Sequence, residues 1–134
     1  MSYCPTPLEM KIWKSEAGPM CVAKLHEGFK SLSSGFTMND WWCGYVVIPV
    51  DHPFYRQGYG CWRDSEDHPE EVCTSCHIQD LNVHGGITFA DFIGEDWCIG
   101  FDCNHFWDRH EPKDFEYVKA ECEKLARQVK EHEK

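Results

Sequence analysis

The chain has 134 residues and a formal net charge of −10, with 23 Asp and Glu against 13 Lys and Arg. This length fits one domain with its own hydrophobic core, and the acidic balance argues against non-specific nucleic-acid binding, because few cations are present to displace phosphate counterions. No apolar run is long enough to span a membrane, and the first residues lack the basic start and apolar stretch of a secretory signal, so we expect a cytoplasmic protein.

The first half of the chain is expected to supply two strands. Residues 1–18 contain Pro, Gly and Ser and are expected to form a loose arm in which Ile12 and Trp13 pack against the rest of the protein. A first strand is expected at 20–25. Residues 41–50 form the strongest strand pattern, because they are apolar on both alternating sets, which predicts a central position in a sheet. Residues 51–80 are polar and rich in acids, and we expect an insertion outside the core.

Two further strands are predicted at 83–89 and 97–103, where alternation separates two faces. One face carries the large apolar side chains: Val83, Ile87, Phe89, Trp97, Ile99, Phe101 and Cys103. The other face carries His84, Gly86, Thr88, Cys98, Gly100 and Asp102. His84, Thr88 and Asp102 are therefore expected to lie together on the face opposite the large apolar side chains.

The last segment predicts an amphipathic helix over residues 113–130. Its apolar residues recur at steps of three and four: Phe115, Val118, Cys122, Leu125 and Val129. This stripe is expected to cover the apolar face around Ile87, Phe89, Ile99 and Phe101. The predicted fold class is α+β: a single domain with an antiparallel sheet of about four strands and a C-terminal helix packed on one face.

The first candidate site consists of His84, Asp102, His105 and Asp108. Two imidazoles and two carboxylates can bind a divalent metal that activates water, or act as a general base with its orienting partner. This chemistry makes a metal-dependent hydrolase one interpretation. The structural alternative is that the carboxylates cap a turn and the histidines bond to neighbouring backbone groups.

The second candidate site lies in the segment with Cys73, Cys76 and His77. The nine cysteines are interpreted mainly as reduced thiols, and the CxxC spacing suits a structural zinc site, with Cys61 as a further ligand. Zinc or another divalent metal is the expected cofactor. The alternative is a pair of unliganded cysteines, and covalent haem is disfavoured because its attachment occurs in exported proteins.

A third set of residues predicts a ligand pocket: Tyr45, His52, Gly85, Gly86 and Thr88. An aromatic ring suits a nucleobase, and backbone N–H groups beside glycines suit a phosphate. Most aromatic residues of the chain are, on the alternative interpretation, core material.

The order of several short motifs resembles a family of small uncharacterised proteins of phages and prophages. The motifs are Gly44-Tyr45-Val46, His52-Pro53, His84-Gly85-Gly86-Ile87-Thr88-Phe89, Gly100-Phe101-Asp102-Cys103-Asn104-His105, and Tyr117-Val118 with Glu121, Leu125 and Ala126. The match runs from roughly residue 20 to 129, and residues 61–80 are longer than in a typical member. The resemblance implies a phage accessory protein without implying an activity.

Three functions follow as expectations. The first is a phage accessory protein that binds a small ligand, such as a nucleotide-like host signal. The second is the metal-dependent hydrolase, with enzymatic activity left open. The third is an acidic inhibitor of protein–protein contacts that docks on a basic host protein, whose binding would depend on salt. An oligomer is compatible with each of them.

Overall fold

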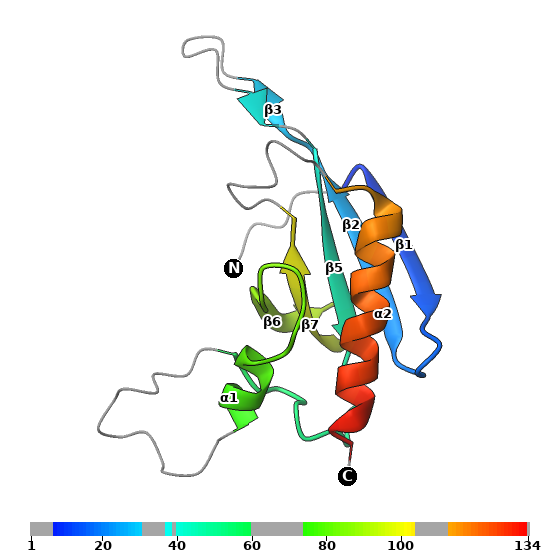
Figure 1. The fold of residues 1–134 in the computed structure, drawn as a ribbon, viewed down its shortest axis with the longest axis vertical. Helices are drawn as coiled ribbons and strands as arrows, with labels where there is room; N and C mark the ends of the chain where they lie inside the picture. Colours follow the sequence, from blue (N-terminus) through cyan, green and yellow to red (C-terminus); the bar gives the residue numbers. More distant parts are fainter. Residues whose placement is uncertain (1–6, 31–36, 39, 60–73, 104–112, 134) are drawn as a thin grey trace, which may run out of the picture.

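The computed structural model describes residues 7–30, 37–38, 40–59, 74–103 and 113–133. Five strands form one antiparallel sheet in the order β1-β2-β5-β7-β6, and β3 pairs with β4 in a separate two-stranded sheet. The elements are β1 (Glu9–Lys14), β2 (Met20–His26), β3 (Phe29–Lys30), β4 (Thr37–Met38), β5 (Trp41–Val47), α1 (Thr74–Gln79), β6 (Phe89–Ile93), β7 (Asp96–Asp102) and α2 (Phe115–Glu131). Helix α2 lies across one face of the sheet, over β5 and β2 (Figure 1).

This architecture confirms the predicted α+β class, with five strands in the main sheet instead of about four. The additional strand is β1, so the expectation of a loose arm is wrong for residues 9–14. Trp13 explains the order of this segment, because its Nε1–H donates to Glu123 of α2 over 3.0 Å and its ring packs edge-on against Phe115. Gly18, at φ +123°, permits the tight turn that returns the chain into β2.

The central position predicted for β5 is confirmed, since it pairs with β2 on one side and β7 on the other. Its glycine explains how closely the helix approaches. A Cβ atom at Gly44 would lie 2.6 Å from both Cys122 Sγ and Phe101 Cε1. The absence of a side chain at this position therefore lets α2 pack directly on the middle of the sheet.

Helix α2 begins at Phe115, two residues after the predicted start, and Asp114 caps it. The Asp114 side chain accepts a hydrogen bond from the backbone N–H of Tyr117 over 2.9 Å, which satisfies one of the free N–H groups of the first turn. The buried residues of the helix are Val118, Cys122, Leu125, Ala126 and Val129. They pack in the main core with residues of the sheet that include Val46, Ile99 and Phe101.

The predicted strand at 83–89 is wrong. Gly85 and Gly86 have φ angles of +69° and +80°, and the Gly86 N–H donates to Val83 O over 2.9 Å, so the chain turns here. The strand β6 begins only at Phe89. As a result Phe89 does not join Ile87 under α2, and instead packs against Tyr45 on the opposite face.

The segment 51–80, expected outside the core, contributes to the core at both of its described ends. Phe54 is 1% exposed and Ile78 of α1 is 0% exposed. His52 joins Phe54 to α2, because its Nε2–H donates to Val129 O over 2.7 Å while its Nδ1 accepts from Phe54 N–H over 3.0 Å. In the described part of the chain, no helix is long and apolar enough to cross a membrane.

Candidate functional site

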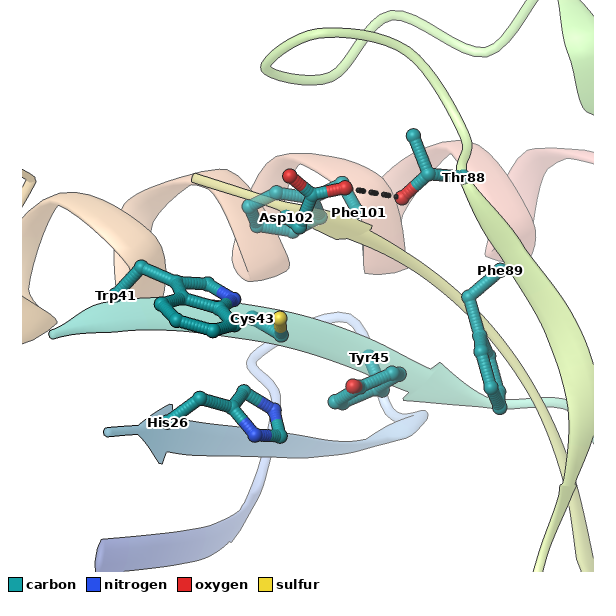
Figure 2. A pocket seen from close by; sticks show the side chains of 8 residues that line it. All are labelled: His26, Trp41, Cys43, Tyr45, Thr88, Phe89, Phe101 and Asp102. Atoms are coloured by element: carbon teal, nitrogen blue, oxygen red, sulfur yellow. Dashed lines mark hydrogen bonds between the residues drawn. The ribbon is translucent and has the colours of Figure 1, made fainter. Parts of the chain in front are cut away.

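The face of the sheet opposite α2 carries a pocket of about 410 Å³. It is lined by residues from β2, β5, β6, β7 and the loop before β6: His26, Trp41, Cys43, Tyr45, Thr88, Phe89, Phe101 and Asp102 (Figure 2). Two of the lining residues, Cys43 and Tyr45, belong to a small apolar cluster on this face that also contains Val22 and Cys98. Because alternate residues of a strand point to opposite faces, the same strands supply the main core on one side and this pocket on the other.

Aromatic rings form the walls of the pocket. His26 and Trp41 are directly paired across β2 and β5, and their rings stack with centroids 5.4 Å apart at an interplanar angle of 27°. Tyr45 and Phe89 meet edge-to-face at 5.1 Å and 80° (Figure 2). Rings fixed by contacts of this kind provide flat apolar surfaces for a ligand at a low cost in side-chain entropy.

A glycine sets the position of the Tyr45 ring. Gly100 is the residue of β7 paired with Tyr45, and a Cβ atom there would lie 2.5 Å from Tyr45 Cδ1. The ring therefore lies over the backbone of Gly100. Lys24 Nζ is 5.6 Å from the centroid of the same ring, which places a cation beside the aromatic wall.

The polar end of the pocket is a pair of side chains. Thr88 donates its hydroxyl hydrogen to Asp102 Oδ2 over 2.9 Å. The backbone of Thr88 is held on both sides, since its N–H donates to Gly100 O over 2.9 Å and its carbonyl accepts from the Tyr59 hydroxyl over 3.0 Å. A carboxylate accepts about four hydrogen bonds, so Asp102 can accept from more than one donor.

The thiol and the imidazole of the pocket are uncharged near neutral pH. Burial, reinforced by the negative charge of Asp102, raises the pKa of Cys43 to about 12. Burial, together with the nearby cation of Lys24, lowers the pKa of His26 below its usual 6.5. Cys43 is therefore a protonated thiol and a poor nucleophile at neutral pH. The pocket combines neutral rings with one carboxylate.

His84 takes part in a different set of contacts from Asp102. Its backbone N–H donates to Glu121 Oε1 over 2.8 Å, and its Nδ1 shares a 2.8 Å hydrogen bond with the hydroxyl of Tyr117. Both partners belong to α2, on the helix side of the sheet, so the expectation that His84 shares the face of Thr88 and Asp102 is not met. His105 and Asp108 lie outside the described residues, and the metal-dependent hydrolase stays a prediction.

Of the residues predicted to bind a ligand, the structure places some in the pocket and others outside it. Tyr45 and Thr88 line the pocket, whereas Gly85 and Gly86 form the turn before it. His52 is buried in the main core, and both of its ring nitrogens are used in hydrogen bonds there. Sequence reasoning missed His26, Cys43, Phe89 and Phe101 as pocket residues. The alternation of β2 and β5 carried the signal for His26 and Cys43, but the register that brings them together was not known.

The residues predicted to bind zinc lie partly outside the described residues. Cys61 and Cys73 lie outside the described residues, and of Cys76 only the backbone in α1 is described. His77 is exposed on α1, and its ring centroid lies 5.6 Å from that of His132. Across the described ranges, no group of three or more His, Cys, Asp or Glu side chains is arranged to hold a metal ion. The zinc site stays a prediction.

Comparisons with known proteins identify no relative of this chain. A scan against known protein families finds no match, and searches of curated proteins and of solved structures find no similar protein. The resemblance to phage proteins therefore stays a prediction. The chemistry of the pocket is the remaining guide to function.

Proposed function

We propose that this protein binds a small planar heteroaromatic ligand, such as a nucleobase or nucleoside, in the pocket on the open face of the sheet. The observation that carries the proposal is the carboxylate of Asp102, oriented by Thr88 at one end of a pocket with aromatic walls. On this proposal the protein acts by sequestering its ligand, in keeping with the role of a phage accessory protein that captures a host signal.

The size and lining of the pocket support a ligand of this class. Small-molecule sites commonly have volumes of about 300–1,000 Å³ and combine apolar walls with few polar groups. A volume of about 410 Å³ falls within that range. The stacked pair of His26 and Trp41 offers a flat surface on which a planar ring gains roughly 1–3 kcal/mol by stacking.

The polar end of the pocket selects which edge of the ligand it meets. A carboxylate accepts hydrogen bonds and repels phosphate, so Asp102 favours a ring edge with amino or N–H donors, as in cytosine or guanine. This part of the proposal differs from the phosphate contact expected at Gly85 and Gly86. An anionic group of the ligand would instead be placed toward Lys24, beside the Tyr45 ring.

Calorimetric titration with nucleosides of the four common bases tests the proposal. We expect binding that favours bases with exocyclic amino groups and that weakens by roughly tenfold or more in Asp102→Asn, because one hydrogen bond to a charged acceptor is lost. Asp91→Asn is the matched control: Asp91 is an exposed carboxylate of β6 whose Oδ1 accepts from Phe92 N–H, a role that Asn also fills. If no nucleoside binds, or if both variants weaken binding equally, the proposal is wrong.

A further inference from the structure

The two edges of the main sheet, β1 and β6, use their outward backbone groups differently (Figure 1). In an antiparallel sheet every second residue of an edge strand points its N–H and C=O groups away from the sheet. Ser15 N–H donates to Pro19 O over 3.0 Å, which continues the β1–β2 register and assigns the inward hydrogen bonds to the odd-numbered residues of β1. The backbone groups of Met10 and Ile12 therefore point outward.

The β6 edge is capped by its own side chain. Cys103 N–H donates to Trp42 O over 2.9 Å, which continues the β5–β7 register. The backbone N–H and C=O groups of odd-numbered residues from β7 to Cys103 therefore point toward β5. Those of the even-numbered residues of β7 point toward β6. With Asp91 paired to Cys98, the outward N–H groups of β6 are those of Ala90 and Phe92. Phe92 N–H donates to Asp91 Oδ1 over 2.7 Å, and this carboxylate hinders the addition of another strand at that position.

Within the described ranges, the β1 edge has no comparable cap at the outward backbone groups of Met10 and Ile12. The strand is also apolar at the surface. Leu8, Met10 and Ile12 are 53%, 51% and 59% exposed, and Met10 and Ile12 face the open side of the sheet. An exposed apolar edge of this kind is a template for pairing with another strand.

The charges of β1 match those of a second copy of the same strand. Glu9 and Lys11 lie on the face opposite Met10 and form an ion pair at 3.0 Å. If two copies of β1 pair antiparallel with Met10 opposite Met10, each Glu9 stands opposite Lys11 of the other copy. The pairing does not extend to Leu8, because its N–H donates inward to Leu25 O over 2.8 Å. A register shifted by two residues, with Met10 opposite Ile12, places Lys11 opposite Lys11, which is destabilising.

We propose that the protein forms a symmetric dimer through β1, centred on Met10, in which two five-stranded sheets join into one. This inference is independent of the proposed ligand. An axis perpendicular to the sheet keeps the two open faces on the same side. An apolar groove of about 340 Å³ extends across the open face from β1 to Ile93 of β6, and its end at Met10 and Ile12 then lies at the seam between the copies.

A dimer held by one short strand pair is a small interface, and the charge of −10 on each copy opposes it. We therefore expect a concentration-dependent equilibrium between monomer and dimer. Sedimentation equilibrium of the full chain measures it directly. A chain that stays monomeric at every concentration tested overturns the proposal.

Charge variants test the register. Glu9→Lys and Lys11→Glu each create two like-charge pairs across the seam, so each is expected to weaken dimerisation by roughly tenfold. The double variant Glu9→Lys with Lys11→Glu restores opposite charges at both places and is expected to restore the dimer. A double variant no better than the single ones would overturn the proposed register, and with it the proposal.

Backbone variants test the edge. Met10→Pro removes the outward N–H and leaves the hydrogen bonds to β2 in place, so the dimer is expected to dissociate. Met10→Val keeps the N–H and an apolar side chain and is the matched control, expected to dimerise. Circular dichroism checks that both variants fold. A dimer unaffected by Met10→Pro places the interface elsewhere and overturns the proposal, and the charge variants decide the matter if Met10→Pro does not fold.

Discussion

Thr88 and Asp102 meet across the open face of the sheet, where the threonine hydroxyl donates to the carboxylate over 2.9 Å. The contact links the last residue of an irregular loop to the last residue of β7. The loop is fixed by the hydrogen bonds of the Thr88 backbone with Gly100 and with the Tyr59 hydroxyl. On the proposed function, this orientation exists before a ligand arrives, which would lower the cost of binding.

Thr88→Val tests this orientation. The substitution removes the hydroxyl donor but keeps the shape of the side chain, so we expect ligand affinity to fall several-fold, while the free energy of unfolding changes by less than about 1 kcal/mol at this exposed position. Calorimetric titration and thermal unfolding measure the two effects. Thr88→Ser keeps the donor and should bind as the unmodified protein does; equal losses in both variants would show that the hydroxyl is not responsible.

Gly44→Ala tests how closely α2 approaches the sheet. The new Cβ atom would lie 2.6 Å from Cys122 Sγ and Phe101 Cε1, so the helix or the Phe101 ring must shift. We expect the free energy of unfolding to fall by about 1–3 kcal/mol, the usual cost of overpacking a core. Gly58→Ala is the control, because a Cβ there meets no atom within 4 Å. Urea unfolding of both variants gives the comparison, and equal stabilities would contradict the close contact.

His52→Ala tests whether this histidine is structural. It removes a buried ring that bonds to Val129 O and Phe54 N–H, leaving both backbone groups without these partners. We expect a loss of about 2–4 kcal/mol in the free energy of unfolding, measured by urea denaturation. Ligand affinity of the folded variant should be unchanged, since His52 does not line the pocket. A stable variant with weakened binding would return His52 to the ligand site.

Alkaline pH is expected to destabilise the fold through Cys98, which is 1% exposed. Burial, with Asp96 as a second cause, raises the pKa of this thiol from 9.0 to about 12. Below pH 9 both the folded and unfolded states hold the proton, so the contribution to stability is complete. Between pH 9 and 12 the unfolded state loses the proton first, and the free energy of unfolding falls as pH rises.

The measurement compares the unmodified protein with Cys98→Ala by urea unfolding at several pH values from 8 upward. The unmodified protein should lose stability more steeply, because the variant lacks one proton linkage. Groups such as lysine and tyrosine titrate in both proteins and cancel in the difference. Parallel curves would contradict the raised pKa of Cys98.

Elements with a strong periodic pattern were predictable from the sequence. The amphipathic stripe of α2 and the apolar runs of β2, β5 and β7 each specify one type of element, and the structure confirms all four within a few residues. β1 was missed because Pro, Gly and Ser around it suggested a loose arm, whereas its order depends on Trp13 reaching Glu123, distant in the sequence. β6 was placed too early because alternation takes no account of two glycines with positive φ.

The pocket was half predictable. Alternation alone placed Asp102 on the face opposite the core and grouped it with Thr88, and this grouping is confirmed. The aromatic walls depend on register: His26 meets Trp41 only because β2 and β5 pair at those positions. The separation of His84 from Asp102 depends on the turn at Gly85 and Gly86, which directs His84 to Tyr117.

The carboxylate at the β6 edge bears on how far assembly of the proposed dimer can proceed. Because the Asp91 carboxylate occupies the Phe92 N–H, a strand that adds at β6 must first displace this hydrogen bond, whereas pairing through β1 uses the other edge of each copy. The proposed dimer therefore has a carboxylate at each end of the joined sheet. This aspartate opposes open-ended growth into a fibre, and replacing it would weaken this protection against aggregation.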